Sequence, residues 1–174
     1  MKRSALLMLV ALVAGCASQP PAPISKIPPG NLTVAEVRSD VDHFIGSEVR
    51  WGGTITKVEN KATQTWVEVI GRELRKDGQP KMSGPTGGRF IASFQGFADP
   101  AVYSVGNLLT VVGTVEGKAT RPIGEYSYDF PVVAVTGSYL WRVEPGPDPA
   151  DYPPPWWYYD PWPFFPGYYS PYFW

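Results

Sequence analysis

The sequence predicts a mainly β protein, a small and strongly coiled OB-like barrel of five to six strands with one N-terminal helix. Apolar and polar residues alternate with a period of two in five separate segments after residue 47. Glycines stand inside several of these segments and favour tight coiling. One stretch before them, residues 33–46, has the periodicity of a helix instead. An open sandwich is the second choice of fold.

The helix is expected to begin after Thr33. The Thr33 hydroxyl can accept a hydrogen bond from the backbone three residues later, where Glu36 completes a capping box. Gly46 is placed to end the helix. Its apolar stripe consists of Val34, Val37, Val41 and Phe44 or Ile45. One face of this helix can therefore cover a core.

The strands are separated by recognisable turns. The expected strands are residues 48–55, 67–69, 89–94, 109–115 and 126–143. Asn60-Lys61 marks a turn after the first, and the polar, Gly-rich and Pro-rich residues 75–88 predict a long loop after the second. Gly52-Gly53 predicts a bulge or a sharp coil, and Pro131 predicts an edge position or a bulge.

Composition excludes several classes of function. The 174 residues carry 15 Lys and Arg against 16 Asp and Glu, a net charge of −1, whereas binding to nucleic acid needs a basic surface. One cysteine excludes a disulfide framework and a cysteine-based zinc site. One histidine, His43, would have to serve every role of a catalytic histidine. We therefore expect no enzyme, no metal, no cofactor and no nucleic-acid partner.

The N-terminus has the pattern of an export signal. Lys2 and Arg3 precede the uncharged residues 5–13, which at ~1.5 Å per residue cover about 14 Å and are too short to span a bilayer. The following Val13-Ala14-Gly15-Cys16 resembles the bacterial lipobox. That resemblance implies cleavage before Cys16 and acylation of its sulfur and its new amino terminus. Three acyl chains form a permanent anchor, and Ala17 implies, by analogy, the outer membrane.

Four regions follow from these patterns. Residues 1–15 are the expected signal peptide and residues 16–31 a proline-rich tether, about 45 Å long if extended at ~3.1 Å per residue. Residues 32–144 form the expected barrel domain. Residues 145–174 form a tail of prolines and aromatic side chains without Lys or Arg. Proline at this density prevents regular helix and sheet.

Several short motifs together resemble the Slp family of outer-membrane lipoproteins. They are Trp51-Gly52-Gly53, Gly96-Phe97-Ala98-Asp99-Pro100, residues 110–115, residues 128–133 and Leu140-Trp141. The resemblance implies a lipid-anchored periplasmic domain associated with starvation and envelope stress, with no established enzymatic activity or cofactor. It covers residues 33–143 and the lipobox, which leaves the tail outside the common core. Independently of the family, Asp99-Pro100 favours a turn, and Phe97 is expected to plug one mouth of the barrel.

Two sets of aromatic residues are candidate contacts. Trp51 and Trp66 are expected near the barrel mouth, where a binding module would hold a small envelope ligand or polysaccharide. The candidate contacts of the tail are Trp156, Trp157, Tyr158, Tyr159, Trp162, Phe164 and Phe165. Their rings suit the headgroup layer of a membrane, a glycan or a partner protein of the envelope. Alternatively, the tail packs back over the barrel.

Overall fold

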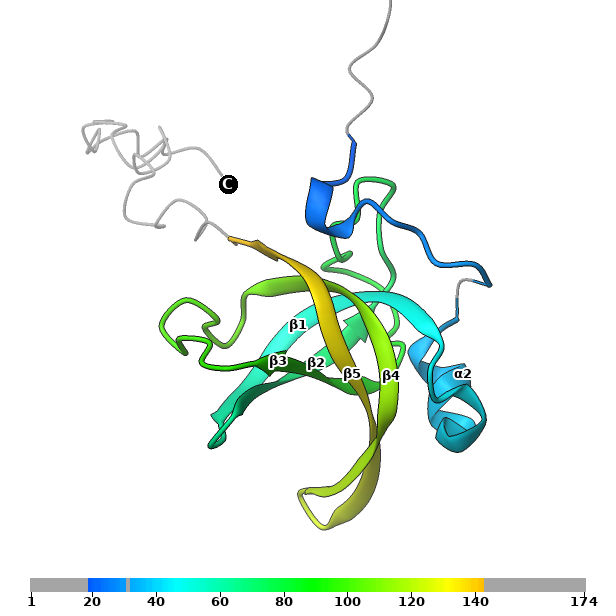
Figure 1. Ribbon diagram of the computed structural model, residues 1–174, viewed down its shortest axis with the longest axis vertical. Coiled ribbons are helices and arrows are strands. Elements are labelled where there is room, and N and C mark those ends of the chain that lie inside the picture. Colours follow the sequence, from blue (N-terminus) through cyan, green and yellow to red (C-terminus); the bar gives the residue numbers. More distant parts are fainter. Residues whose placement is uncertain (1–18, 31, 143–174) are drawn as a thin grey trace, which may run out of the picture. The chain divides into compact units, whose positions relative to one another are not determined.

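The computed structural model describes residues 19–30 and 32–142, and these form a closed five-stranded barrel (Figure 1). The strands are β1 (Glu48–Asn60), β2 (Gln64–Arg72), β3 (Arg89–Gln95), β4 (Leu108–Ile123) and β5 (Tyr126–Trp141). Their order around the barrel is β1-β2-β3-β5-β4, and β4 closes on β1. The pairing is antiparallel except between β3 and β5, which run parallel. The predicted OB-like barrel is confirmed.

The helical segment is shorter and more broken than predicted. The α-helix α2 (Val34–Ser39) is followed by a 3₁₀ turn, η2 (Val41–Phe44). The capping box is present: the amide of Glu36 donates to the Thr33 hydroxyl at 3.2 Å, and the Thr33 amide donates to the Glu36 carboxylate at 2.7 Å. That backbone hydrogen bond lowers the pKa of Glu36. The break occurs at Asp40, whose carboxylate accepts from the amide of His43 and starts the second turn.

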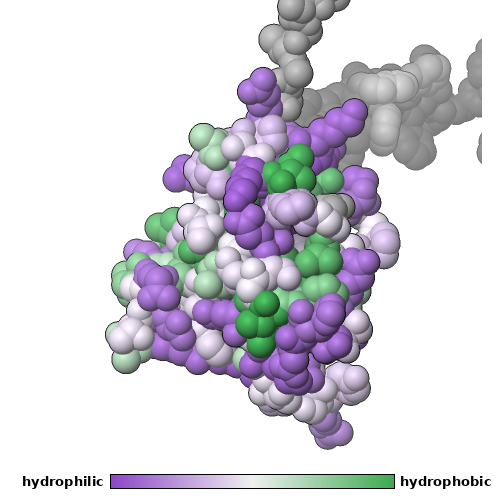
Figure 2. All heavy atoms as spheres, turned by 45° about the vertical axis from the view of Figure 1, so that its right-hand side comes forward, coloured by the Kyte–Doolittle hydropathy of each residue, from purple (hydrophilic) through white to green (hydrophobic). Residues whose placement is uncertain are grey.

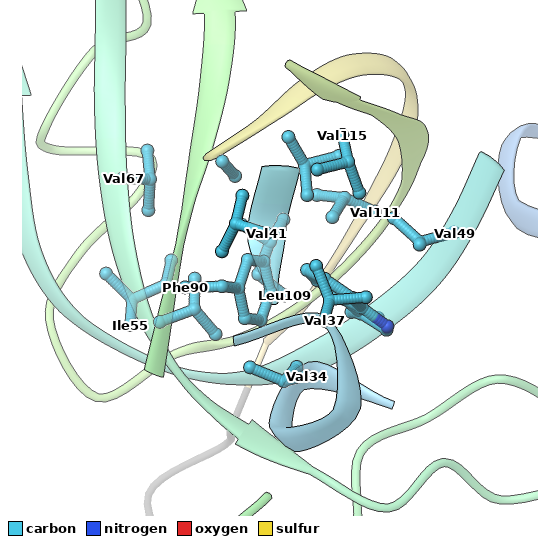
Figure 3. Close-up of a cluster of buried hydrophobic side chains, with 14 residues drawn as sticks. Val34, Val37, Val41, Val49, Ile55, Val67, Phe90, Leu109, Val111 and Val115 are labelled. Carbon is cyan, nitrogen blue, oxygen red and sulfur yellow. The ribbon is translucent and has the colours of Figure 1, made fainter. Parts of the chain in front are cut away.

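The apolar stripe of this segment packs into the barrel. Val34, Val37 and Val41 join inward-facing strand residues in one buried cluster (Figure 3). Phe90 of β3 and Leu109 of β4 are both fully buried in that cluster. The helical segment therefore contributes to the barrel's core, as its periodicity predicts. Within the described residues, no helix is long and apolar enough to cross a membrane.

Glycines allow neighbouring strands to approach closely. A Cβ atom on Gly53 would overlap the carbonyl oxygen of Ile70, and one on Gly113 would overlap that of Ala134. The β1–β2 register continues through Gly53 and shifts only after Ile55, so the bulge lies beyond the Gly52-Gly53 pair and not at it. These contacts explain how so few strands close into a barrel.

The hairpin of β4 and β5 extends further than predicted. Strand β4 continues to Ile123, and its pairing with β5 shifts between Val115 and Gly117. Pro131 pairs with Lys118 directly beside this shift, as expected of a proline near a bulge. The extension escaped prediction because its residues alternate between exposed and half-buried positions and include few apolar side chains.

The loop between β3 and β4 corrects one expectation. Phe97 is 74% exposed, so it does not plug a barrel mouth. The buried neighbour is Ala98, whose amide donates to the Thr65 hydroxyl at 2.9 Å. Asp99 forms the predicted turn, since its carboxylate accepts from the amide of Ala101 at 2.8 Å. Because this turn directs Ala98 inward, the adjacent Phe97 faces solvent.

Residues 19–30, here called the N-terminal strap, pack against the barrel (Figure 1). Their 3₁₀ turn η1 (Ala22–Ile24) contacts β4 and β5. Ile24 is fully buried, and Arg50 of β1 donates to its carbonyl oxygen at 3.2 Å. The carbonyl oxygen of Pro23 occupies the place that a Cβ atom on Gly137 would take. The described part of the expected tether is therefore docked rather than extended, because Ile24 buries its side chain there.

Replacing Gly53 with alanine is expected to lower the free energy of unfolding by about 1–3 kcal/mol, because the added methyl overlaps backbone. The measurement is urea unfolding of the chain made without residues 1–15 and with Cys16→Ser. Gly87→Ala is the control, since its Cβ meets nothing closer than 3.9 Å. Equal stability of Gly53→Ala and the parent would contradict the close strand approach.

Replacing Gly137 with alanine is expected to release the N-terminal strap, because the methyl takes the place of the Pro23 carbonyl. Trypsin should then cut after Lys26 at least several times faster, while cleavage after Lys57 in β1 stays slow. The Gly87→Ala protein serves as control. If cleavage after Lys26 is unchanged, the strap is not held at Gly137.

Candidate ligand cavity

A cavity of about 570 Å³ lies between the strap, the start of α2, and the part of the β1–β2 pair that contains residues 50–52 and 71–72. The β2–β3 loop, residues 73–88, forms the remaining wall. The apolar residues that line the cavity are Ile27, Leu32, Val34, Trp51, Leu74 and Pro85. Small-molecule sites typically have volumes of roughly 300–1,000 Å³ and mainly apolar walls. The cavity has the size and lining of such a site.

Trp51 supports the cavity from the barrel side. Its ring is 4% exposed and meets the edge of Phe90 with ring centroids 5.3 Å apart. Its indole N–H donates to the carbonyl oxygen of Leu32 at 2.7 Å, which fixes the chain where it enters α2. Trp51 therefore lines the cavity and also belongs to the core. Its contact with a ligand remains a prediction.

Backbone pairing at Gly71 holds the end of the loop in place. The Gly71 amide donates to the carbonyl of Gly88 at 2.7 Å, and the Gly87 amide donates to the carbonyl of Gly71 at 2.9 Å. A Cβ atom on Gly71 would come within 3.2 Å of the Val34 side chain. The absence of a side chain there lets α2, β2 and the loop meet around the cavity.

Two guanidinium groups line the cavity, and both are anchored by neutral carbonyl oxygens. Arg50 donates to Ile24 at 3.2 Å, and Arg72 donates to Gly84 at 2.7 Å. Among residues 19–30 and 32–142, neither guanidinium has a carboxylate within 4.0 Å. The carboxylate among the lining residues, Glu73, lies 2.9 Å from Lys81. The cavity is therefore cationic.

Arg72 also carries an unsatisfied donor. Its Nε–H is buried and finds no hydrogen-bond partner within the part of the chain that the structure describes. A buried donor without a partner is uncommon, because the donor has lost its hydrogen bond to water and gains none from the protein. This Nε–H therefore faces the interior of the protein, and the remaining donors of the guanidinium are the Nη groups.

Trp66 lies away from this cavity, on the outer face of β2. It alternates along the strand with the fully buried Val67, so the structure does not bring Trp66 and Trp51 together. The Trp66 ring packs against a second apolar cluster, formed by Ile91, Phe130 and Val132. The Lys61 ammonium lies 3.2 Å from the centroid of the ring. Trp66 thus belongs to a separate surface cluster.

Charged residues complete that surface cluster. Arg121 lies over the Trp66 ring at 4.7 Å and contacts the carboxylates of Glu59 at 2.8 Å and Glu68 at 3.0 Å. Hydrogen bonds from Arg121 lower the pKa of Glu59. Because the cations over the ring are paired or exposed at a strand end, we assign this cluster a role in stabilising the outer face.

The remaining predicted site residues lie outside the described residues. These are Cys16, Trp156, Trp157, Tyr158, Tyr159, Trp162, Phe164 and Phe165. Sequence reasoning missed Arg50 and Arg72 as site residues. Arg72 directly follows Gly71, and Arg50 lies two residues before Gly52. An arginine within two residues of a strand glycine was the available signal. Within residues 19–30 and 32–142, no group of His, Cys, Asp or Glu could hold a metal ion.

The face that carries α2 shows no broad apolar surface. Its hydrophobic residues form small patches separated by hydrophilic ones (Figure 2). Extended docking faces for proteins have larger contiguous apolar patches. On this side of the molecule, the cavity is therefore a better candidate site than a broad protein interface.

Comparison with known proteins identifies relatives in one bacterium. The chain is 32% identical over 151 residues to "Uncharacterized lipoprotein YeaY" of Escherichia coli strain K12, covering 84% of this chain and 76% of that protein. It is 27% identical over 143 residues to "Outer membrane protein Slp" of the same strain, covering 82% and 76% respectively.

A family model, described as "Outer membrane lipoprotein Slp family", matches residues 13–168. The match includes Cys16 and most of the aromatic tail. The expectation that the tail lies outside the common part of the family is therefore wrong. Since the match spans most of the sequence, this chain belongs to the Slp family of outer membrane lipoproteins.

Proposed function

We propose that this outer membrane lipoprotein is a binding module that faces the periplasm and holds a small envelope ligand in the cavity beside Trp51. The observation that carries the proposal is the cavity of about 570 Å³, with its apolar walls and two arginines that have no carboxylate partner among residues 19–30 and 32–142. Apolar walls with a few directed polar groups are the usual composition of a ligand site.

Cys16 is the proposed point of attachment to the membrane. It is the one cysteine of the chain and ends the lipobox-like Val13-Ala14-Gly15-Cys16. Membership of a lipoprotein family supports a removed signal peptide and acyl chains. Several acyl chains on one residue hold a protein at a bilayer far more firmly than one.

The docked strap keeps the barrel near the bilayer. Three residues lie between Cys16 and Pro20 of the strap, so four residue steps of ~3.5 Å give at most about 14 Å of chain. The cavity includes Ile27 of the same strap. The proposed site therefore operates close to the membrane surface, where envelope molecules are concentrated.

Binding is a better proposal than catalysis. The polar side chains that line the cavity are arginines, threonines and Glu73. The Thr33 hydroxyl is engaged with Glu36, and Glu73 is engaged with Lys81. This set supplies donors and positive charge for holding an anion, and lacks a nucleophile paired with a base.

A structural role in protecting the envelope under stress or starvation is the competing proposal. Its support is membership of the Slp family. The aromatic tail suits either role, since its rings could contact the membrane interface, a glycan or an envelope protein. The cavity favours the binding module, because a purely structural barrel has no need of a cationic hollow.

Changing Cys16 to serine is expected to abolish labelling of the protein with radioactive palmitate and to release it from the membrane fraction. The sulfur is the proposed acceptor of the diacylglycerol. Ser18→Ala, two residues away, is the matched control and should keep the label. An unlabelled parent protein would overturn the proposed anchor.

Changing Thr86 to tryptophan is expected to block the cavity, since Thr86 lines it from an exposed loop position. A lipid-and-metabolite extract of the envelope should raise the thermal midpoint of the soluble parent, with Cys16→Ser, by several degrees. The tryptophan variant should lose that rise, and Thr86→Val should keep it. No rise in the parent with any envelope fraction would overturn the binding module.

A further inference from the structure

We propose that the cavity binds an anionic amphiphile with a single apolar chain. Its carboxylate or phosphate pairs with Arg72 and Arg50, and its chain lies against the apolar wall beside Trp51. This inference rests on the proposed function and names the chemical class of the ligand.

The charge of the cavity selects an anion. Arg50 and Arg72 each use one N–H on a neutral carbonyl oxygen, so the positive charge of each stays uncompensated by a carboxylate among the described residues. A guanidinium has five N–H donors, which match the geometry of carboxylate and phosphate oxygens. The two arginines therefore provide an anion site with donors to spare.

The protein fixes the orientation of the Arg72 guanidinium. Its Nε–H faces the interior and has no partner among residues 19–30 and 32–142. Its Nη1 is held in place by the carbonyl of Gly84 at 2.7 Å. The remaining Nη donors are the ones that can donate to an oxygen anion in the cavity.

The rest of the wall selects an apolar chain. Leu32, Val34 and Leu74 line the cavity together with the buried face of Trp51. The Trp51 N–H is already bonded to Leu32, so it has no donor left for a sugar hydroxyl. This wall suits methylene groups better than a glycan or a nucleotide.

The size and position of the cavity fit one acyl chain of a membrane amphiphile. The volume of about 570 Å³ lies in the middle of the range of sites for drug-sized molecules. Ile27 of the strap forms part of the wall, and the strap follows the proposed anchor closely. An anchored protein therefore presents this cavity beside the most abundant source of amphiphiles in the envelope.

The test is calorimetric titration of the protein that begins at residue 16 and carries Cys16→Ser. Four probes are used, and each amphiphile is kept below its critical micelle concentration. The probes are palmitate, lysophosphatidylglycerol, the neutral monopalmitoylglycerol, and inorganic phosphate. We expect one or both anionic amphiphiles to bind at least about tenfold more tightly than monopalmitoylglycerol. The preferred anion identifies a free fatty acid or a lysophospholipid as the source. Phosphate alone should bind far more weakly, because it lacks the chain.

Variants assign the binding to the arginines. Arg72→Met should weaken the preferred amphiphile at least about tenfold, and Arg72→Lys should fall between this variant and the parent because it keeps the charge without the planar set of Nη donors. Arg75→Met is the matched control: Arg75 lies three residues further on, in the β2–β3 loop, bonds to Gln79 and does not line the cavity. It should bind like the parent. Thermal midpoints measured without ligand show whether each variant is folded.

Two results would overturn the inference. One is equal affinity for the neutral and anionic amphiphiles, and the other is unchanged affinity in a folded Arg72→Met protein. If neither amphiphile binds while the envelope extract still stabilises the parent through a site that Thr86→Trp blocks, the ligand class is wrong and the binding module stands. If the extract also fails, the proposed function itself is wrong.

Discussion

The packing of the N-terminal strap against a glycine of β5 is the contact on which the rest of the arrangement depends. The Pro23 carbonyl occupies the space beside Gly137, and Ile24 buries its whole side chain next to it. This contact turns a proline-rich segment that would otherwise extend into part of the domain. The same segment continues into Ile27, a wall of the cavity. One backbone contact thus links the membrane anchor, the barrel and the candidate site.

The barrel and the cavity use glycine for the same physical reason. At Gly53 and Gly113, two strand backbones come so close that a side chain would overlap a carbonyl oxygen. At Gly71, the missing side chain gives room for Val34 of α2. Glycines therefore permit both the close approach of the strands and the packing of α2 beside the cavity. Arg72, next to Gly71, and Arg50 of β1 then add charge to a mainly apolar cavity.

Local patterns predicted the elements well and their packing poorly. The capping box at Thr33 and the turn at Asp99 depend on neighbours in the sequence, and both are present. Docking of Ile24 and the outward turn of Phe97 depend on distant contacts, with Gly137 and Thr65, that no local pattern encodes. Arg50 and Arg72 escaped notice because only the β1–β2 register brings them near each other: Arg72 lies opposite Gly52, two residues from Arg50.

The most direct test is a crystal structure of the lipidated protein purified from its own outer membrane, with no lipid added. The account predicts an elongated molecule in the cavity, its anionic end at Arg72 and its chain beside Trp51, with the strap still seated at Gly137. A cavity that holds only water, or a strap lifted away from Gly137, would contradict it.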